Sequence, residues 1–306
     1  MVKEEDLDKL FNTFKPNLNN HKQILEVHND SLNYLKNNKE CYVKLADYFR
    51  AYYEIGDLVP QTSDNFVSGH SFPYSESYFE LENSYQLCLE GFYSYSFAAL
   101  RSVLELGILG IFFAVDDKEY EEVRPWITSE KRTPNFQTAL KRLNKISYFN
   151  EYNERFNYVK NVSDVYDHLS GFIHTRGYKY SSRSKNRCNT NKFNEEALLE
   201  YLKYMFSIIS NLITLMLIKY PIGLKSIPLF EKFGFNSLAG GFLEDYQIKL
   251  IKSVLNKEEL EFLEHISDND CDVKSIVEEI ESLPEMTDEE LEEQRKYFGF
   301  DKLHND

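Results

Sequence analysis

Residues 94–115 read SYSFAALRSVLELGILGIFFAV, and this stretch decides what kind of fold the chain can have. Its only charged side chains are Arg101 and Glu105, so a helix here is apolar on almost every face. A helix that is apolar all round is stable only when other elements cover it. The stretch therefore predicts the buried central helix of a bundle, ended by Asp116 and Asp117.

The segments on either side of this run have helical periodicity, and none has the alternation that is typical of strands. Apolar residues recur at helical spacings in further segments that we expect to be helices: Asp30–Glu54, Ser75–Tyr93, Pro134–Ile146, Asn157–His174 and Asn194–Tyr220. Gly177 is expected to end the helix before it, and Pro221 the last of these helices. The chain thus predicts an all-α fold with at least half of its residues in helices.

Three regions follow from these patterns: an N-terminal helical region (1–70), a helical core (71–220) and a C-terminal region (221–306). Residues 221–241 contain six Gly or Pro residues and predict an irregular connection, although their apolar side chains must still pack. Short acidic helices are expected after it. The last should begin at Thr287, with Glu290 in the capping-box position three residues later.

Composition places the protein among water-soluble cytoplasmic proteins. The four cysteines are far apart and have no metal-ligand spacing, so we expect reduced thiols: Cys41, Cys88, Cys188 and Cys271. The chain opens on charged residues without a signal-peptide pattern. The uncharged run 204–218 is shorter than the roughly 20 residues that a membrane span needs. We therefore expect no membrane association, and the sequence indicates no cofactor or metal site.

Charge is unevenly distributed along the chain. Residues 131–187 contain twelve Lys or Arg against four acids, a local net charge of +8, which leaves −23 elsewhere because the whole chain carries −15. Residues 256–306 contain eighteen acids and five bases. Two interpretations are open: the basic region faces phosphate groups of a partner, or it docks onto the acidic C-terminal region of the same chain.

Arg101 and Glu105 are four residues apart, so they lie on the same helix face and can form an ion pair. Burying either one alone would cost several kcal/mol, so the pair or a third partner must compensate both charges. One interpretation is a structural ion pair that sets how helices pack. The other is that Arg101 points into a cleft and offers its guanidinium group to a phosphate or carboxylate.

The polar face of the Asn157–His174 helix provides the natural partner for such a cleft. Ser163, Asp167, Ser170 and His174 fall within about 60° of one another on a helical wheel. A carboxylate and a serine below an imidazole could orient His174 and raise its pKa, although the same pattern also fits a solvated face. His168 is expected to pair locally with Asp164.

Two stretches, Phe97–Glu105 (FAALRSVLE) and His168–His174 (HLSGFIH), together resemble the HEPN-type helical domains, the "higher eukaryotes and prokaryotes nucleotide-binding" bundles. The resemblance covers roughly residues 71–220. Such domains are common in bacterial toxin–antitoxin and anti-phage defence systems, and many are metal-independent ribonucleases that act as dimers. They carry an Arg followed about one helical turn later by a His, whereas here Arg176 follows His174.

The resemblance implies a HEPN-like bundle that binds or cleaves RNA without metal or cofactor, as a homodimer and with an antitoxin or other protein partner. In that case His174 would transfer protons, Arg176 and Arg101 would stabilise negative charge, and Ser170 would complete the catalytic site. The RNA backbone would be held without sequence readout by four basic residues: Lys179, Arg183, Lys185 and Arg187.

Two other functions remain open on the sequence. A non-catalytic helical adaptor, sensor or immunity-type module would bind a protein partner, and the missing Arg-to-His spacing favours it. The local charge of +8 favours the ribonuclease instead. The third alternative is an enzyme that acts on a small anionic metabolite at a cleft beside Arg101.

Overall fold

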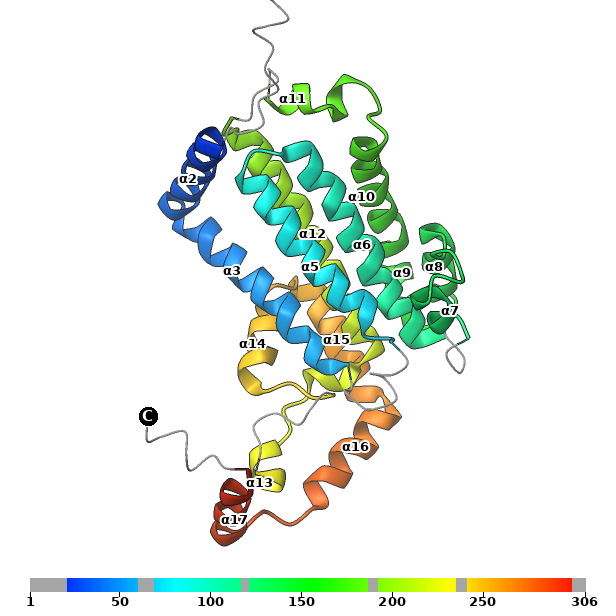
Figure 1. Cartoon of the computed structure of the whole chain (residues 1–306). Coiled ribbons are helices and arrows are strands. Elements are labelled where there is room, and N and C mark those ends of the chain that lie inside the picture. Colours follow the sequence, from blue (N-terminus) through cyan, green and yellow to red (C-terminus); the bar gives the residue numbers. More distant parts are fainter. Residues whose placement is uncertain (1–20, 60–68, 117–120, 187–191, 235–240, 299–306) are drawn as a thin grey trace, which may run out of the picture.

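The computed structural model describes residues 21–59, 69–116, 121–186, 192–234 and 241–298. Helices make up about 81% of the structure, and the described part of the chain has no strand. The predicted all-α class is therefore confirmed. Figure 1 shows a bundle of long helices, with shorter helices at its two ends and along one side.

Helix α6 (Tyr93–Asp116) lies at the centre of the bundle, as its apolar sequence requires. The helices packed against it are α5 (Phe72–Leu89), α8 (Phe136–Leu143), α10 (Tyr158–Ile173) and α12 (Glu195–Lys219). Buried side chains occur along the whole length of α6, among them Phe97, Leu100, Leu104, Ile108 and Phe112. The predicted central helix is confirmed.

A tight turn joins α5 to α6 and makes them an antiparallel hairpin. Gly91 has φ +80° in this turn, a left-handed conformation that glycine adopts without strain. The N–H of Phe92 donates to the carbonyl of Leu87 at 2.8 Å, and that of Gly91 to Cys88 at 3.0 Å. These two bonds form a Schellman motif, which ends α5 and lets α6 begin at once.

The predicted single helix over Asp30–Glu54 is wrong, because the chain forms α2 (His21–Asn37) and α3 (Lys39–Glu54) there. Asn38 has non-helical dihedrals, and its side chain accepts a hydrogen bond from the N–H of Cys41 at 3.3 Å. An asparagine in this position caps a new helix. The short turn η1 (Ile55–Leu58) follows α3.

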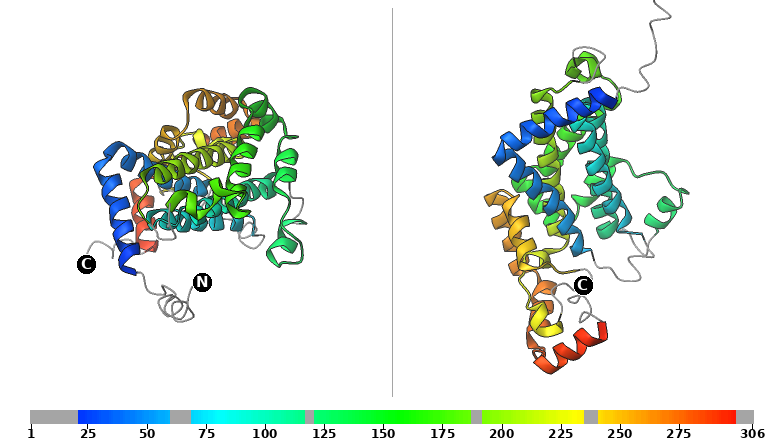
Figure 2. Two further views of the ribbon diagram at one scale, coloured as in Figure 1. Left: turned by 90° about the horizontal axis from the view of Figure 1, so that it is seen from above. Right: turned by 60° about the vertical axis from the view of Figure 1, so that its left-hand side comes forward.

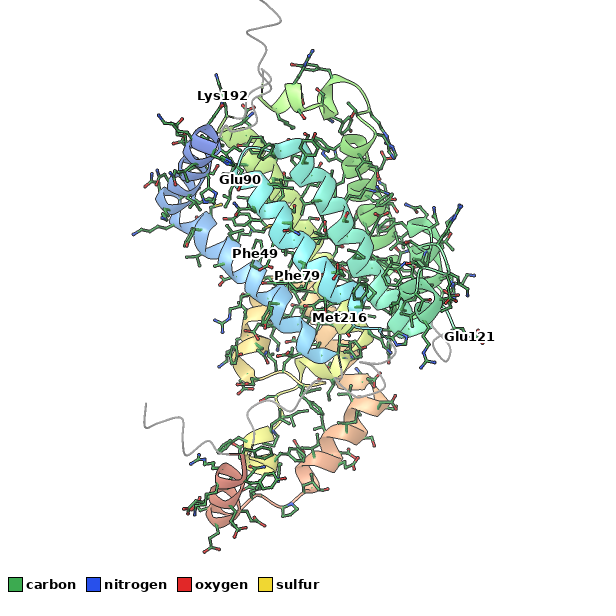
Figure 3. The ribbon with its side chains drawn as sticks, in the orientation of Figure 1. Phe49, Phe79, Glu90, Glu121, Lys192 and Met216 are labelled. Carbon is green, nitrogen blue, oxygen red and sulfur yellow. The ribbon has the colours of Figure 1, made fainter. Side chains whose placement is uncertain are left out.

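Helix α3 packs on α5 through aromatic rings. Phe49, labelled in Figure 3, lies between the two helices with its ring centroid 5.2 Å from that of Tyr85. Tyr52 is buried, and its hydroxyl is 2.7 Å from that of Ser77. These contacts attach the N-terminal helices to the bundle, so the division at residue 70 does not separate two cores.

Between α6 and α12 the chain contains short helices that periodicity did not predict. They are α7 (Val123–Ile127), α9 (Ser147–Phe156), η2 (Tyr178–Tyr180) and α11 (Ser182–Asn186). The last two lie in the described part of the polar, basic segment that follows α10. Each of these elements is too short for a repeating apolar face, so only tertiary packing stabilises it.

The end of α10 also differs from the prediction. Thr175, at φ +43°, takes the left-handed position after the helix, and the N–H of Arg176 donates to the carbonyl of Gly171 at 3.0 Å. Gly177 has φ +82° but ψ −175°, so it redirects the chain two residues later and does not end the helix. A threonine in this conformation is uncommon, which is why the sequence pointed to the glycine.

Helix α12 begins after Asn194, whose side chain accepts a hydrogen bond from the N–H of Ala197, and ends before Pro221, as predicted. The C-terminal region contains η3 (Pro221–Leu224), α13 (Leu229–Phe233), α14 (Asp245–Ser253), α15 (Lys257–Asn269), α16 (Cys271–Ser282) and α17 (Asp288–Phe298). The predicted start of α17 is confirmed: the N–H of Thr287 donates to Glu290 at 2.8 Å.

The acidic C-terminal helices meet only part of the basic region. Helix α15 packs on α9, where the Tyr152 hydroxyl donates to Glu259 at 2.8 Å and the Arg155 guanidinium lies 5.9 Å from the Phe262 ring. Helices α16 and α17 instead extend away from the bundle, at the end opposite α11 (Figures 1 and 2). At this contact Glu259 bonds to a tyrosine and Arg155 packs on an aromatic ring, so the contact pairs no cation of the basic region with an acid and does not account for the local charge of +8.

Close packing of α6 on α12 gives a test of the central helix. A Cβ at Gly107 would lie 2.5 Å from Cδ1 of the buried Leu212, whereas one at Gly110 would be 3.4 Å from the nearest atom. We expect Gly107→Ala to lower the free energy of unfolding by about 1–3 kcal/mol through overpacking. Gly110→Ala, the control, should leave it unchanged or raise it through better helix propensity. Equal urea midpoints for the two variants would contradict this packing.

Candidate functional site

Arg101 and Glu105 form the predicted ion pair, with Arg101 Nη2 2.9 Å from Glu105 Oε1. The third partner is the hydroxyl of Tyr166 on α10, which accepts from Arg101 Nη2 at 2.5 Å and donates to Glu105 Oε1 at 2.9 Å. The pair is only part-buried, since 19% of the Arg101 side chain and 31% of the Glu105 side chain are exposed. The three groups form a closed ring of hydrogen bonds between α6 and α10.

Aromatic packing holds this cluster in place. The ring of Tyr166 stacks on that of Phe136 in α8 with 4.0 Å between centroids, and the guanidinium of Arg101 lies 4.7 Å from the Tyr166 ring. Burial raises the pKa of the Tyr166 hydroxyl, against the lowering effect of Arg101. The hydroxyl therefore stays protonated and keeps donating to Glu105. This geometry supports the structural interpretation of the ion pair.

The side chains expected around His174 do not assemble as predicted. His174 is exposed and follows the last turn of α10. Asp167 does not orient it, because the Asp167 carboxylate pairs with Nη1 of Arg176 at 2.7 Å. Ser170 is buried, and its hydroxyl donates to the carbonyl of Tyr166 at 2.7 Å. Among the described residues, no hydrogen bond or ion pair links Arg101 to His174 or Arg176.

The residues predicted to hold a nucleic-acid backbone have different surroundings. Three of the four, Lys179, Arg183 and Lys185, belong to residues 174–186, which we call the basic segment. Lys179 and Arg183 are exposed, as is Tyr178, with 70% of its surface open to solvent. Lys185 is part-buried and paired with Glu200 of α12. Arg187 lies outside the described residues.

The basic segment lies at the upper end of the bundle in Figure 1, above α10 and beside the first turns of α6 and α12. Ser94 at the start of α6 and Ser182 of α11 are joined by a hydrogen bond of 2.6 Å between their hydroxyls. Tyr95, the next residue of α6, is 63% exposed. Exposed cations and exposed tyrosine rings therefore share this end of the molecule.

Sequence reasoning missed one cluster beneath the basic segment. The Glu200 carboxylate pairs with Lys185 through Oε2 and lies 3.5 Å from His168 Nε2 through Oε1. The His168 ring stacks on Tyr204, with 4.4 Å between centroids. The expected local pair of His168 with Asp164 is therefore wrong. Glu200 is 15 residues from one partner and 32 from the other, so no spacing could have indicated the cluster.

A groove of about 850 Å³ lies elsewhere, between α3, α12 and the start of α15. Its lining mixes two lysines, Lys39 and Lys44, with three acids and several hydroxyl and amide groups. Lys44 is engaged with its own surroundings, since its ammonium lies 4.8 Å from the Phe206 ring. Within the described residues, no group of three or more His, Cys, Asp or Glu side chains could hold a metal ion.

Comparison with protein-family models, with curated proteins and with solved structures returned no match to this chain.

Two helices, α6 and α12, are long and apolar enough to cross a membrane. In the most apolar part of each helix, 56% of α6 and 67% of α12 is buried inside the structure.

The cluster around Arg101 predicts a moderate loss of stability when its acid is removed. Glu105→Ala leaves the guanidinium with the Tyr166 hydroxyl as its remaining partner, and we expect about 1–3 kcal/mol lower free energy of unfolding. Glu105→Gln keeps an acceptor and should cost less. Urea unfolding of both variants measures this, and a loss below about 0.5 kcal/mol for Glu105→Ala is the outcome that contradicts a closed hydrogen-bond ring.

The cluster around Glu200 predicts a pH effect. The contact with His168, together with the ion pair to Lys185, lowers the pKa of the Glu200 carboxyl from 4.5 to about 2. A carboxyl whose pKa is lower in the folded than in the unfolded state stabilises the fold at pH values above its unfolded-state pKa. This stabilisation is lost as the pH falls towards the folded-state pKa. The free energies of unfolding of wild type and Glu200→Gln should therefore converge between about pH 5 and pH 2. A gap that stays constant over this range would contradict the pairing.

Proposed function

We propose that this protein binds single-stranded RNA at the upper end of the bundle, through the basic segment. Within ten residues of this segment, His174, Arg176, Tyr178, Lys179 and Arg183 are all exposed. This concentration of cations around an open aromatic ring, in a chain whose net charge is −15, is the observation that carries the proposal.

Single-stranded nucleic acids are bound by cations that follow the backbone and by aromatic rings on which bases stack. Lys179 and Arg183 supply cations that no acidic side chain engages among the described residues. Tyr178 supplies a ring for stacking, and Tyr95 places a second exposed ring at the same end. Contacts of this kind hold a strand without reading its sequence. The HEPN resemblance supports RNA as the nucleic acid and a homodimer as the assembly.

Cleavage of the bound strand is a second candidate function, which the exposure of His174 beside these cations favours. Attack of an RNA 2′-hydroxyl on the next phosphate needs a proton acceptor and a cation near the phosphorane. His174 would accept the proton of the 2′-hydroxyl, and Arg176 would stabilise the charge of the phosphorane. The P–O5′ bond would then break to leave a 2′,3′-cyclic phosphate, and water would protonate the departing 5′-oxygen. Arg101 and Ser170 are not part of this proposal, because Arg101 is bonded to Glu105 and Tyr166 and the Ser170 hydroxyl is bonded to a backbone carbonyl.

Replacing Lys179 and Arg183 together by alanine should weaken binding of oligouridine and oligocytidine about equally, because phosphate contacts are lost. The slope of log affinity against log salt should fall by about 0.7 for each lost contact with a single strand. Tyr178→Ala should weaken binding by about 1–3 kcal/mol through lost stacking, with little change in that slope. Fluorescence anisotropy over a salt series measures these effects.

The matched control replaces two lysines of the C-terminal helices α15 and α17, Lys257 and Lys296, whose side chains are 89% and 60% exposed. It changes the net charge equally and should leave affinity nearly unchanged. His174→Ala should abolish any cleavage while leaving binding nearly intact. If wild type neither retains nor cuts RNA at low salt, the proposal fails and the adaptor function takes its place.

A further inference from the structure

The basic segment contains little regular secondary structure that could fix its conformation. Its two helical elements, η2 and α11, are three and five residues long, which is too short for a stable helix in isolation. What holds the segment is a small number of contacts with α6, α10 and α12. These contacts use a different set of side chains from those that face solvent.

One anchor is the ring of Tyr180. It packs directly on Gly171 of α10, where a Cβ would lie 2.5 Å from the ring. The ring also makes edge contacts with Phe172 at 5.2 Å and with His168 at 5.5 Å between centroids. Only glycine leaves room for this ring at position 171. Tyr180 therefore points into the bundle, whereas Tyr178 points out of it.

The second anchor is Lys185, which the sequence suggested as an RNA contact. Only 16% of its side chain is exposed, and its ammonium lies 5.6 Å and 5.9 Å from the rings of Phe97 and Phe172. Its charge is compensated by Glu200, which is 29% exposed and has the second contact with His168. The backbone carbonyl of Lys185 also accepts a hydrogen bond from the amide of Asn194 at 2.6 Å.

We propose that Glu200 is a positioning residue for RNA binding: through Lys185 it holds the basic segment against α12 so that Tyr178, Lys179 and Arg183 face a bound strand together. This inference rests on the proposed function. Holding the segment before binding lowers the conformational entropy that the complex must lose. The carboxylate is ionised at neutral pH, because its pKa is about 2.

Positioning and simple electrostatics predict opposite effects for Glu200→Gln. Removing an acid beneath a basic surface, and releasing Lys185, should tighten RNA binding if charge alone matters. If Glu200 positions the segment, the same change should weaken binding although the protein becomes less acidic. The sign of the change in affinity therefore separates the two explanations.

The experiment compares wild type, Glu200→Gln and the charge-exchanged double variant Lys185→Glu with Glu200→Lys. The control is Glu196→Gln, which removes an exposed carboxylate one turn earlier in α12. Trypsin cleavage after Lys179 and Arg183 is followed by mass spectrometry in the absence of RNA, and oligouridine affinity by anisotropy. Circular dichroism first establishes that each variant keeps the helical content of wild type.

We expect Glu200→Gln to be cleaved about tenfold faster in the segment, because local opening governs proteolysis, and to bind oligouridine more weakly than wild type. In the double variant, the cleavage rate and the affinity for oligouridine should both return towards the wild-type values. Glu196→Gln should match wild type in both. Unchanged cleavage, or tighter RNA binding by Glu200→Gln, overturns the positioning role. Faster cleavage with no RNA binding by wild type supports the anchoring of the segment but refutes the proposed function.

Discussion

Helix α6 must be covered on every side, and most of the bundle follows from this requirement. Four helices pack around it, and the tight turn at Gly91 brings the first of them back along its length. Arg101 and Glu105 of α6 would be costly at the edge of this core if left alone. Tyr166 of α10 bonds to both through one hydroxyl, so a helix that covers α6 also supplies a polar partner for its ion pair.

The basic region shows that charge counted along a sequence differs from charge available to a partner. Arg155 packs over aromatic rings at the α9–α15 contact, Lys185 pairs with Glu200 under the segment, and Arg176 pairs with Asp167. Lys and Arg can bury their aliphatic stems while their charged ends find a partner, so either location suits the same residue type. Lys179 and Arg183 are the cations of the segment that face solvent unpaired within the described chain, and they determine where an anionic strand would bind.

Local patterns predicted the long elements well. Helices α6, α10 and α12 follow from apolar spacing, and the start of α17 from the capping residue Thr287. Asn38 carried the same capping signal and divides α2 from α3, but the apolar spacing continued across it and concealed the break. Helices α7, α9 and α11 were missed because five to ten residues show no full apolar face, and their stability comes from neighbours distant in the chain.

In the candidate site, too, contacts within one helix could be predicted from the sequence and contacts between distant elements could not. The Arg101–Glu105 pair was readable because both partners lie within one turn of one helix. Helical class, central helix and that pair are all determined by residues close together in the chain. The third partner Tyr166, the pairing of Arg176 with Asp167 and the contact of Glu200 with Lys185 and His168 were decided by tertiary structure. Such contacts depend on how separate helices are placed against each other, and a spacing of 15 or 32 residues along the chain carries no information about that placement.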